Sequence, residues 1–487
     1  MTIVKSLTGL VIPDVYILEL LPTPKGFKSL PSGVIGMVGT FERGPVGVPV
    51  TVGDEADFVR KMGNTGTGQF AGANAYMAAR KQGASNFRLI RVLGAGNATA
   101  SLILKDRQGT PADTLKVKAL YPGVYGNSFR VEIANGSIAD TFKLILTGNG
   151  ANEIYDNLNM DPASPRYALT EINGKSLNIA LEDMGSVAVG ANRNPAVKVA
   201  TSLASGSAGS ALTDQSYIGS IDASGNRTGL KALEPVPDVE IIHVAEVGSQ
   251  AVNSALITHA QNFNRFAVLN TPRNQTVDDA VAAVSNYDTD FARMVYGWYL
   301  DDGGHYTAGG GYECGIISVI SPHESPSGNI INGILQGEIP VDRNEAIKLT
   351  TARMSAIVNF GAGWEVVNGV TLSTNPELEQ VYRRRMTSLF EREIPINLRW
   401  AKSKPHTYAP KVKEGLREKV RKQLEAYFEN FRLLEMIESY QVIADESNNT
   451  PETMAGKRLM ADPKVKLWNI ADFIVIRLES GANVEVE

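Results

Sequence analysis

Cysteine is nearly absent from this chain of 487 residues, in which Cys314 is the only one. A single cysteine cannot form an intramolecular disulfide, so a disulfide-stapled scaffold is excluded and a reducing compartment fits. Apolar residues near Cys314 in the sequence favour a buried core thiol over a nucleophile. We therefore expect no cysteine chemistry.

Histidine is scarce as well, with five residues scattered at positions 243, 259, 305, 323 and 406. None has a histidine or cysteine partner at the spacing of metal ligands, so the sequence gives no reason to expect a metal. The densest polar cluster is Asp301-Asp302 with His305, and the glycines around it predict a solvated loop. We expect no metal and no cofactor.

Long hydrophobic runs are missing too, because Pro13, Asp14 and Glu19 interrupt the apolar stretch near the N-terminus. This disfavours a signal peptide and a membrane span. The net charge of −5 provides no overall positive field for nucleic acid. We expect neither membrane insertion nor direct nucleic-acid binding, and assembly in the cytoplasm.

Two glycine-containing segments match nucleotide-binding loops only in part. Gly174-Lys175-Ser176 has the ending of a phosphate-binding loop, but Leu169 stands where the first glycine is required. The pattern Gly66-x-Gly68-x-x-Ala71 follows a helix-like segment instead of a strand, which is the wrong context for a dinucleotide site. A nucleotide-dependent α/β enzyme with a basic C-terminal module is therefore kept only as the alternative function.

Strand-sized apolar runs alternate with helix-like segments in two parts of the chain. The alternation predicts parallel strands with crossover helices, and hence a discontinuous α/β core made of residues 28–95 and 235–372. In its second part we expect strands at 239–244, 266–270 and 292–297 and helices at 249–262 and 276–286. The chain as a whole is predicted to combine α/β and α+β domains.

The segment 96–234 has a different pattern. Apolar and polar residues alternate at 114–120, 129–133 and 142–146, which predicts an antiparallel β-rich insertion domain. Within it, residues 185–230 are rich in Gly, Ser, Ala and Asn and show weak periodicity. We expect this stretch to be a peripheral, loosely ordered surface excursion.

Residues 373–487 are predicted to form a separate α+β domain. Asn375-Pro376-Glu377 is typical of a helix start, since proline suits the first helical position and acid suits the first turn. A longer helix with an apolar stripe is expected at about 411–437. Strands are expected at 440–444, 457–460, 473–478 and 484–487.

Positive charge gathers in this domain. Residues 381–432 contain fourteen Lys or Arg and six Asp or Glu, a net charge of +8. Lys413, Arg417 and Arg421 recur every four residues and so share one side of the long helix. This basic row is either a solvated face or an electrostatic contact with an acidic partner. Nucleic acid is the competing partner, but no aromatic platform is interleaved with the row.

Both ends of the chain carry strand-like segments that have no adjacent hairpin partner. Residues 1–27 read as an arm whose prolines suit an edge strand, and the last four residues alternate Val and Glu. Pairing with the sheet of another subunit would satisfy their free amide and carbonyl groups. The candidates for such inter-subunit strands are Val11, Val15, Ile17, Phe473, Val475, Val484 and Val486.

An ordered set of short stretches resembles one family. They are residues 33–45, the Pro-Gly-x-aromatic-Gly-Asn turn at 122–127, the strand at 266–272, 369–372 followed by 381–385, and then 397–401, 445–451 and 473–478. In this order they resemble the contractile tail sheath proteins of bacteriophages and related injection machines. The resemblance covers both ends of the chain and most of its middle.

This resemblance implies a structural protein that needs neither catalysis nor a cofactor. It implies hexameric rings that stack helically around a tail tube and contract to drive the tube through a host cell envelope. The implied partners are further copies of the chain, the tail tube protein, and baseplate and tail terminator proteins. The implied location is the virion tail, after assembly in the bacterial host cytoplasm.

The resemblance also assigns places to the domains. Residues 96–234 would face outward, the terminal arms would link subunits, and the domain 373–487 would face the tube. It thereby makes tube-contact candidates of Lys413, Arg417, Arg421, Arg383 and Arg384.

Overall fold

The computed structural model describes residues 2–4, 16–18, 27–65, 68–402 and 415–471. The chain divides into two compact units, one of residues 32–386 and one of residues 1–31 with 387–487. The division falls within helix α9 (Val381–Asn397), which contributes residues to both. Helices and strands are mixed throughout, so the predicted α/β and α+β class is confirmed.

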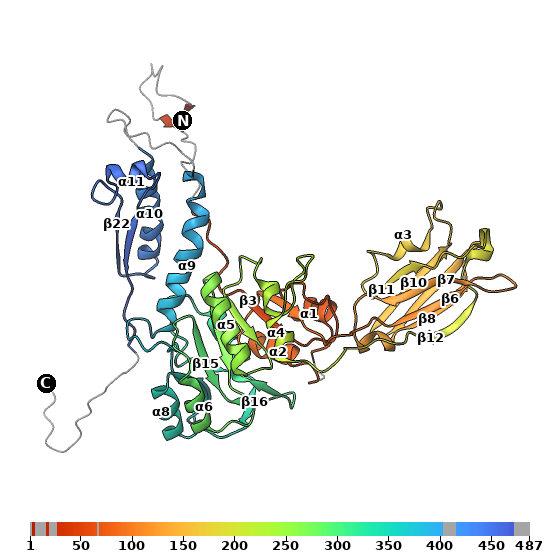
Figure 1. Ribbon diagram of the computed structural model, residues 1–487, viewed down its shortest axis with the longest axis horizontal. Helices are drawn as coiled ribbons and strands as arrows, with labels where there is room; N and C mark the ends of the chain where they lie inside the picture. The colour runs from red at the N-terminus through yellow and green to blue at the C-terminus, as the bar shows by residue number, and fades with distance from the viewer. Residues whose placement is uncertain (1, 5–15, 19–26, 66–67, 403–414, 472–487) are drawn as a thin grey trace. The chain divides into compact units, whose positions relative to one another are not determined.

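A nine-stranded sheet organises the larger unit (Figure 1). Its six central strands are parallel, and the strands beyond them are antiparallel to their neighbours. Strands β13, β14 and β15 confirm the three strands expected in this region. In spatial order the strands are β18 (Ile330–Ile331), β21 (Trp364–Val366), β20 (Met354–Asn359), β15 (Ala292–Tyr296), β14 (Phe266–Asn270), β13 (Ile241–Val244), β3 (Ile35–Gly39), β5 (Phe87–Arg91) and β4 (Val50–Val52).

Helices cover both faces of this sheet, which explains why its central strands are buried along almost their whole length. One face packs against α5 (Gln250–Phe263), α6 (Val277–Val284) and α8 (Arg343–Thr351). The other face packs against α1 (Glu55–Met62), α2 (Ala71–Lys81) and α7 (Gly309–Val319). The hydroxyls of Ser249 and Thr276 cap the N-termini of α5 and α6, and both helices confirm predicted ones.

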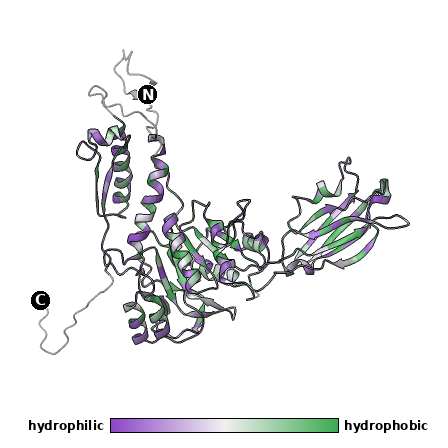
Figure 2. Cartoon of the chain, in the orientation of Figure 1, coloured by the Kyte–Doolittle hydropathy of each residue, from purple (hydrophilic) through white to green (hydrophobic). Residues whose placement is uncertain are grey.

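Residues between β5 and β13 form two antiparallel sheets around a separate apolar core. Figure 2 shows hydrophobic and hydrophilic residues alternating along their strands. Two short helices, α3 (Ala168–Ile172) and α4 (Asp214–Ile218), lie in the same stretch of chain. The sheets are β10 (Ala151–Leu158), β9 (Phe142–Gly148), β8 (Arg130–Asn135) and β12 (Lys198–Ser202), and β11 (Ile179–Asp183), β7 (Asp113–Ala119) and β6 (Ser101–Lys105).

The expectation that residues 185–230 are loosely ordered and peripheral is wrong. Strand β12 pairs with β8, Leu203 is buried in the insertion core, and Tyr217 is buried in the core beside the large sheet. Residues 204–210 run close to residues 94–101 and hydrogen-bond to them along the backbone. A Cβ added at Gly94 would lie 1.9 Å from the carbonyl oxygen of Ser210. Small residues are therefore needed here for close backbone packing.

A third small sheet is formed by the chain between β15 and α8. It consists of β17 (Tyr306–Ala308), β16 (Trp298–Asp301) and β19 (Ile334–Gly337), all antiparallel.

The smaller unit is built on an aromatic cluster. Its long helix α10 (Leu416–Leu433) packs against strand β22 (Ser439–Ile443), which pairs with β23 (Asp462–Lys466) (Figure 1). Phe390 of α9 makes edge contacts with three α10 rings, at centroid distances of 5.3–6.1 Å. Those rings belong to Tyr427, Phe428 and Phe431. The unit also contains α11 (Pro451–Ala455) and the parallel pair β1 (Thr2–Val4) and β2 (Tyr16–Leu18).

Two predicted elements in the C-terminal region are wrong. No helix starts at Asn375, whose side chain accepts the Glu377 amide at 3.0 Å and holds a turn, and α9 begins at Val381. The strand expected at 457–460 lies instead at β23, because Pro451 starts the short helix α11. The predicted strands at 473–478 and 484–487 lie outside the described residues.

Candidate functional site

The order of strands in the large sheet reverses between β3 and β13, and α/β sheets bind ligands at such a point. Here the position is filled by Glu246, just after β13. Its carboxylate accepts the amide of Thr40 at 2.9 Å and the Thr40 hydroxyl at 3.1 Å. The Tyr217 hydroxyl also hydrogen-bonds to it, and burial raises the pKa of Glu246. A carboxylate in this crevice disfavours a phosphate, so the alternative of a nucleotide enzyme loses its usual site.

Helix α7 begins with three consecutive glycines, Gly309–Gly311, a pattern that can cradle a phosphate. Its glycines serve a different purpose. A Cβ added at Gly310 would lie 2.4 Å from Asn270 Oδ1 and 2.7 Å from His243 Cε1. The helix start therefore lies directly on the sheet, with no room for a ligand between them.

Asp301, His305 and Cys314 were the titratable residues considered as candidates from the sequence. Asp301 ends β16 and accepts the amide of His305, which directly precedes β17, at 2.8 Å. Residues 302–305 between the two strands confirm the predicted loop. Cys314 is fully buried in α7, and burial raises the pKa of its thiol well above the ordinary value. The described residues contain no group of His, Cys, Asp and Glu that could hold a metal ion.

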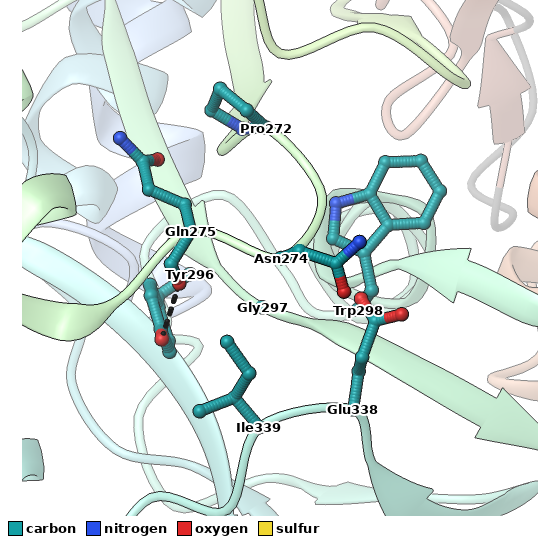
Figure 3. Close-up of a pocket in the computed structure, with 8 residues that line it drawn as sticks. All are labelled: Pro272, Asn274, Gln275, Tyr296, Gly297, Trp298, Glu338 and Ile339. Atoms are coloured by element: carbon teal, nitrogen blue, oxygen red, sulfur yellow. Dashed lines mark hydrogen bonds between the residues drawn. The ribbon is translucent and has the colours of Figure 1, made fainter.

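A small hollow lies beside strand β16 (Figure 3). Its volume is about 10 Å³, roughly the space of one water molecule. The Tyr296 hydroxyl donates to the carbonyl of Gln275 at 2.9 Å on one side, and Trp298 and Glu338 lie on the other. A nucleotide or comparable substrate does not fit in this hollow.

A buried ion pair was not foreseen from the sequence. Arg293 of β15 lies 2.9 Å from the carboxylate of Glu313 on α7, and both side chains are fully buried. Ser355 of β20 donates to the same carboxylate. The three residues connect two strands to the helix that covers them. Because they are buried, we assign them a role in packing.

Arg91 forms a second buried connection that sequence reasoning missed. Its guanidinium is 1% exposed and donates to the carbonyl oxygens of Phe41, Glu42, Gly44 and Pro122 at 2.8–2.9 Å. Pro122 belongs to the Pro-Gly turn of the insertion, and the other three follow β3. Arg91 thus links the large sheet to the insertion. The only signal in the sequence was an arginine at the end of an apolar strand.

The basic row on α10 carries less free charge than the sequence suggested. Arg421 bonds to Glu418 at 2.7 Å and to Glu425 at 3.1 Å on the same helix, and Arg417 lies 3.9 Å from Glu446. The hydrogen bond from Arg421 lowers the pKa of Glu418. Lys413 lies outside the described residues. Within the described part of the row, both arginines therefore have acidic neighbours.

The arginines at the start of α9 lie in the larger unit. Arg383 is 3.2 Å from the exposed Glu377, whereas Arg384 is buried, 3.1 Å from Asp290, with its guanidinium 4.3 Å from the ring centre of Phe291. These bonds give Arg384 a role inside the unit. Contact of either arginine with another chain stays a prediction.

The candidate inter-subunit strands are described only in part. Ile17 lies in β2, where it pairs with Ile3 of β1. Six candidates lie outside the described residues: Val11, Val15, Phe473, Val475, Val484 and Val486.

The sheet β22–β23 is a surface where such strands could pair. Among the described residues it has two strands, and such a pair alone is marginally stable in water. Side chains of β23 are mostly exposed, and Pro463 lacks an amide donor, as is tolerated on an edge strand. Large apolar side chains are also exposed in this unit, among them Leu433, Leu434 and Trp468.

None of the helices in the described ranges combines the length and apolar character needed to cross a lipid bilayer.

A scan of the sequence against protein-family models finds no match, and a search of the curated proteins finds none either. Solved structures do match. One is the sheath tail protein from Desulfitobacterium hafniense, with a TM-score of 0.61 and 15% identity over 89% of this chain and 94% of that chain. Another is the sheath tail protein from Listeria innocua, with a TM-score of 0.61 and 13% identity over 86% and 90% of the two chains.

A third match is the sheath of an extracellular contractile injection system in its contracted state. Its TM-score is 0.58 at 13% identity, over 97% of this chain and 98% of that chain. These matches confirm, for the fold, the resemblance to contractile sheath proteins that the sequence indicated.

Proposed function

We propose that this chain, which has the fold of contractile tail sheath proteins, is a structural sheath subunit of a contractile tail or a related injection system. The observation that carries the proposal is the extent of the fold match, which spans 97% of this chain and 98% of an injection-system sheath. A partial match would fit many α/β proteins, because one fold hosts many functions. A match from end to end supports a sheath role for the chain as a whole more strongly than a match of one domain would.

In this proposal the subunits form hexameric rings that stack helically around a tail tube and contract to drive it through a host envelope. The chain would work without catalysis or a cofactor, since the energy of contraction would reside in two alternative packings of the same subunits. The carboxylate of Glu246 in the sheet crevice and the water-sized hollow at β16 support a structural role over an enzymatic one. Baseplate and tail terminator proteins would be partners at the two ends of the sheath.

Electron microscopy of the purified protein tests the proposal. We expect rings about six subunits round, and tubes at higher concentration. A small closed oligomer that binds a nucleotide would contradict the proposal and favour the alternative enzyme. The same preparation, supplied with tube protein from its own system, would show whether tubes nucleate on that partner.

The tail tube is the proposed partner of the basic row. Replacing the row with glutamate should weaken co-sedimentation with tube protein and leave the subunit folded, and added salt should weaken the unmodified contact because charges are screened over about 10 Å at ~0.1 M. Exchange of Arg166, Lys457 and Arg458 for glutamate, three exposed residues outside α10 and β23, is the matched control. Unchanged tube association would remove the row from the interface. The residues to replace together are Lys413, Arg417 and Arg421.

The terminal arms are the proposed links between subunits. Strand addition to the β22–β23 sheet, or to the segment 473–478 near it in sequence, would satisfy backbone groups on both partners. Removing residues 1–20 or 480–487 should leave a folded subunit that no longer forms stable tubes. Truncated subunits that still build normal tubes would show that the arms are not the links.

A further inference from the structure

Directly after the N-terminal arm (residues 1–27), the side chain of Asn397 hydrogen-bonds to the backbone and holds the chain in place. Asn397 of α9 accepts the Lys28 amide at 2.6 Å through Oδ1 and donates from Nδ2 to the Lys28 carbonyl at 3.0 Å. This pair of bonds is the pattern that a neighbouring strand would make. The carboxamide therefore acts as a one-residue substitute for a strand partner.

One turn earlier on α9, Glu393 continues the same contact. Its carboxylate accepts the Leu30 amide at 2.6 Å and the Ser29 hydroxyl at 3.1 Å on one oxygen. The other oxygen accepts the hydroxyl of Tyr427 on α10 at 2.6 Å. Glu393 is 1% exposed, so these are charge-assisted bonds in a largely dry site. Burial, together with the bond to Glu393, raises the pKa of Tyr427.

An aromatic contact completes the arrangement. The ring of Phe27 stacks on Tyr427, with centroids 4.1 Å apart and an interplanar angle of 24°. Tyr427 is in turn part of the aromatic cluster around Phe390. Phe27 is thereby attached to the core of the unit.

Apolar burial does not explain why residues 28–31 stay in place. Lys28, Ser29 and Pro31 are exposed, and Leu30 is only half-buried. Polar contacts to Lys28, Ser29 and Leu30 hold a segment that offers little hydrophobic area. Directed bonds of this kind resist displacement of the chain along its own axis better than non-directional apolar contact does.

We propose that Glu393, Asn397 and Tyr427 form an anchor for the N-terminal arm, so that a pull on residues 1–26 by a second copy of the chain is transmitted to α9 and α10. The part played by the second copy rests on the proposed sheath function. The hold on residues 27–30 does not, because it is made within one subunit. Contraction would then move the arm and its own helices together, instead of peeling the arm from the subunit.

The test is hydrogen–deuterium exchange of the purified full-length subunit, read at peptides covering residues 27–31. Asn397→Ala removes both bonds to Lys28 from a half-exposed site, so the variant should fold. We expect exchange at Lys28 to be about 10- to 100-fold faster, the ratio that corresponds to losing one or two such bonds. Asn397→Asp keeps the acceptor and loses the donor, so it should give a smaller increase.

Two further variants define the result. Glu393→Ala should speed exchange at Leu30 by a similar factor, and Asn430→Ala, an exposed asparagine on α10, is the matched control that should change nothing. Unchanged exchange in both anchor variants would overturn the proposal. Faster exchange together with normal tubes by electron microscopy would overturn the transmission of force. Should the unmodified protein form no tubes, the sheath function fails, while the exchange data still decide whether the anchor holds the arm.

Discussion

Arg91 offers the sharpest test of how the insertion is attached to the large sheet. The change is Arg91→Met, which keeps most of the apolar stem and removes the guanidinium. It leaves the carbonyl oxygens of Phe41, Glu42, Gly44 and Pro122 without their donor. Burial already lowers the pKa of Arg91 to about 10, so the group carries a desolvation cost that the variant recovers.

The expected loss follows from these opposing effects. A bond from a charged donor contributes about 1.5–3 kcal/mol, but the bonds are not additive and desolvation of the guanidinium opposes them. Breaking a buried network of this kind costs about 3–5 kcal/mol in the free energy of unfolding. Arg91→Lys retains the charge with fewer donors and a different shape, so its loss should be roughly half as large.

Urea unfolding of the soluble subunit, followed by circular dichroism and tryptophan fluorescence, measures the loss. The control is Arg88→Met on the same strand, where a half-buried pair with Asp238 predicts about 1 kcal/mol or less. An Arg91→Met variant that loses no more than the Arg88→Met variant would refute the reasoning. It would mean that contacts other than those of Arg91 hold the insertion, such as the burial of Tyr217 beside the large sheet.

Three other perturbations give separate tests. Burial lowers the pKa of His243 to about 4, so the unfolded chain takes up the proton first, and His243 should contribute about 3 kcal/mol to the loss of stability as pH drops from 6.5 to 4. His243→Gln should remove that contribution in unfolding titrations, while the part due to the buried His259 remains. Burial raises the pKa of Glu246, so its ionisation favours the unfolded chain. The free energy of unfolding of Glu246→Gln should therefore increase relative to that of the unmodified protein as pH rises above 4.5, and a difference that does not change with pH would exclude this explanation. Gly94→Ala should lower the free energy of unfolding by about 2–4 kcal/mol, because the added Cβ meets the Ser210 backbone. In the same thermal unfolding experiment Gly109→Ala should be neutral, because its Cβ meets nothing within 4 Å.

The elements of the large sheet could be predicted because their signals are local. Residues 266–270 are an apolar run of strand length that ends at Thr271-Pro272, and β14 occupies this range. Helix α6 follows a capping Thr276 with acid in its first turn, a standard start. In such segments, propensity, pattern and capping agree with the packing that the fold imposes.

The features that could not be predicted depend on partners far along the chain. Glu240 shows this, because it accepts the Gly33 amide at 2.6 Å and pairs with Arg385 at 2.9 Å, across more than a hundred residues in each direction. No window of sequence contains both partners. The close packing at Gly94 and Gly206 could not be predicted for another reason. A close backbone approach requires small residues, and a run of small residues in a sequence is equally typical of a flexible loop.

The position of the basic row could be predicted from the sequence, but the bonds of its residues could not. Spacing alone placed Arg417 and Arg421 on the long helix, and both lie there. Spacing did not show that Glu418 and Glu425 bond to Arg421, although both lie within four residues of it. Helical neighbours of opposite sign were the available signal.

The nine-stranded sheet ends in very short strands on both sides. Strand β4 has three residues and β18 has two, and each runs antiparallel to its neighbour. Long, flat, unpaired edges invite uncontrolled fibre growth, and short edge strands are one of the ways in which proteins prevent it. If the chain polymerises as proposed, these short edges would keep its largest sheet from pairing outside the specified geometry.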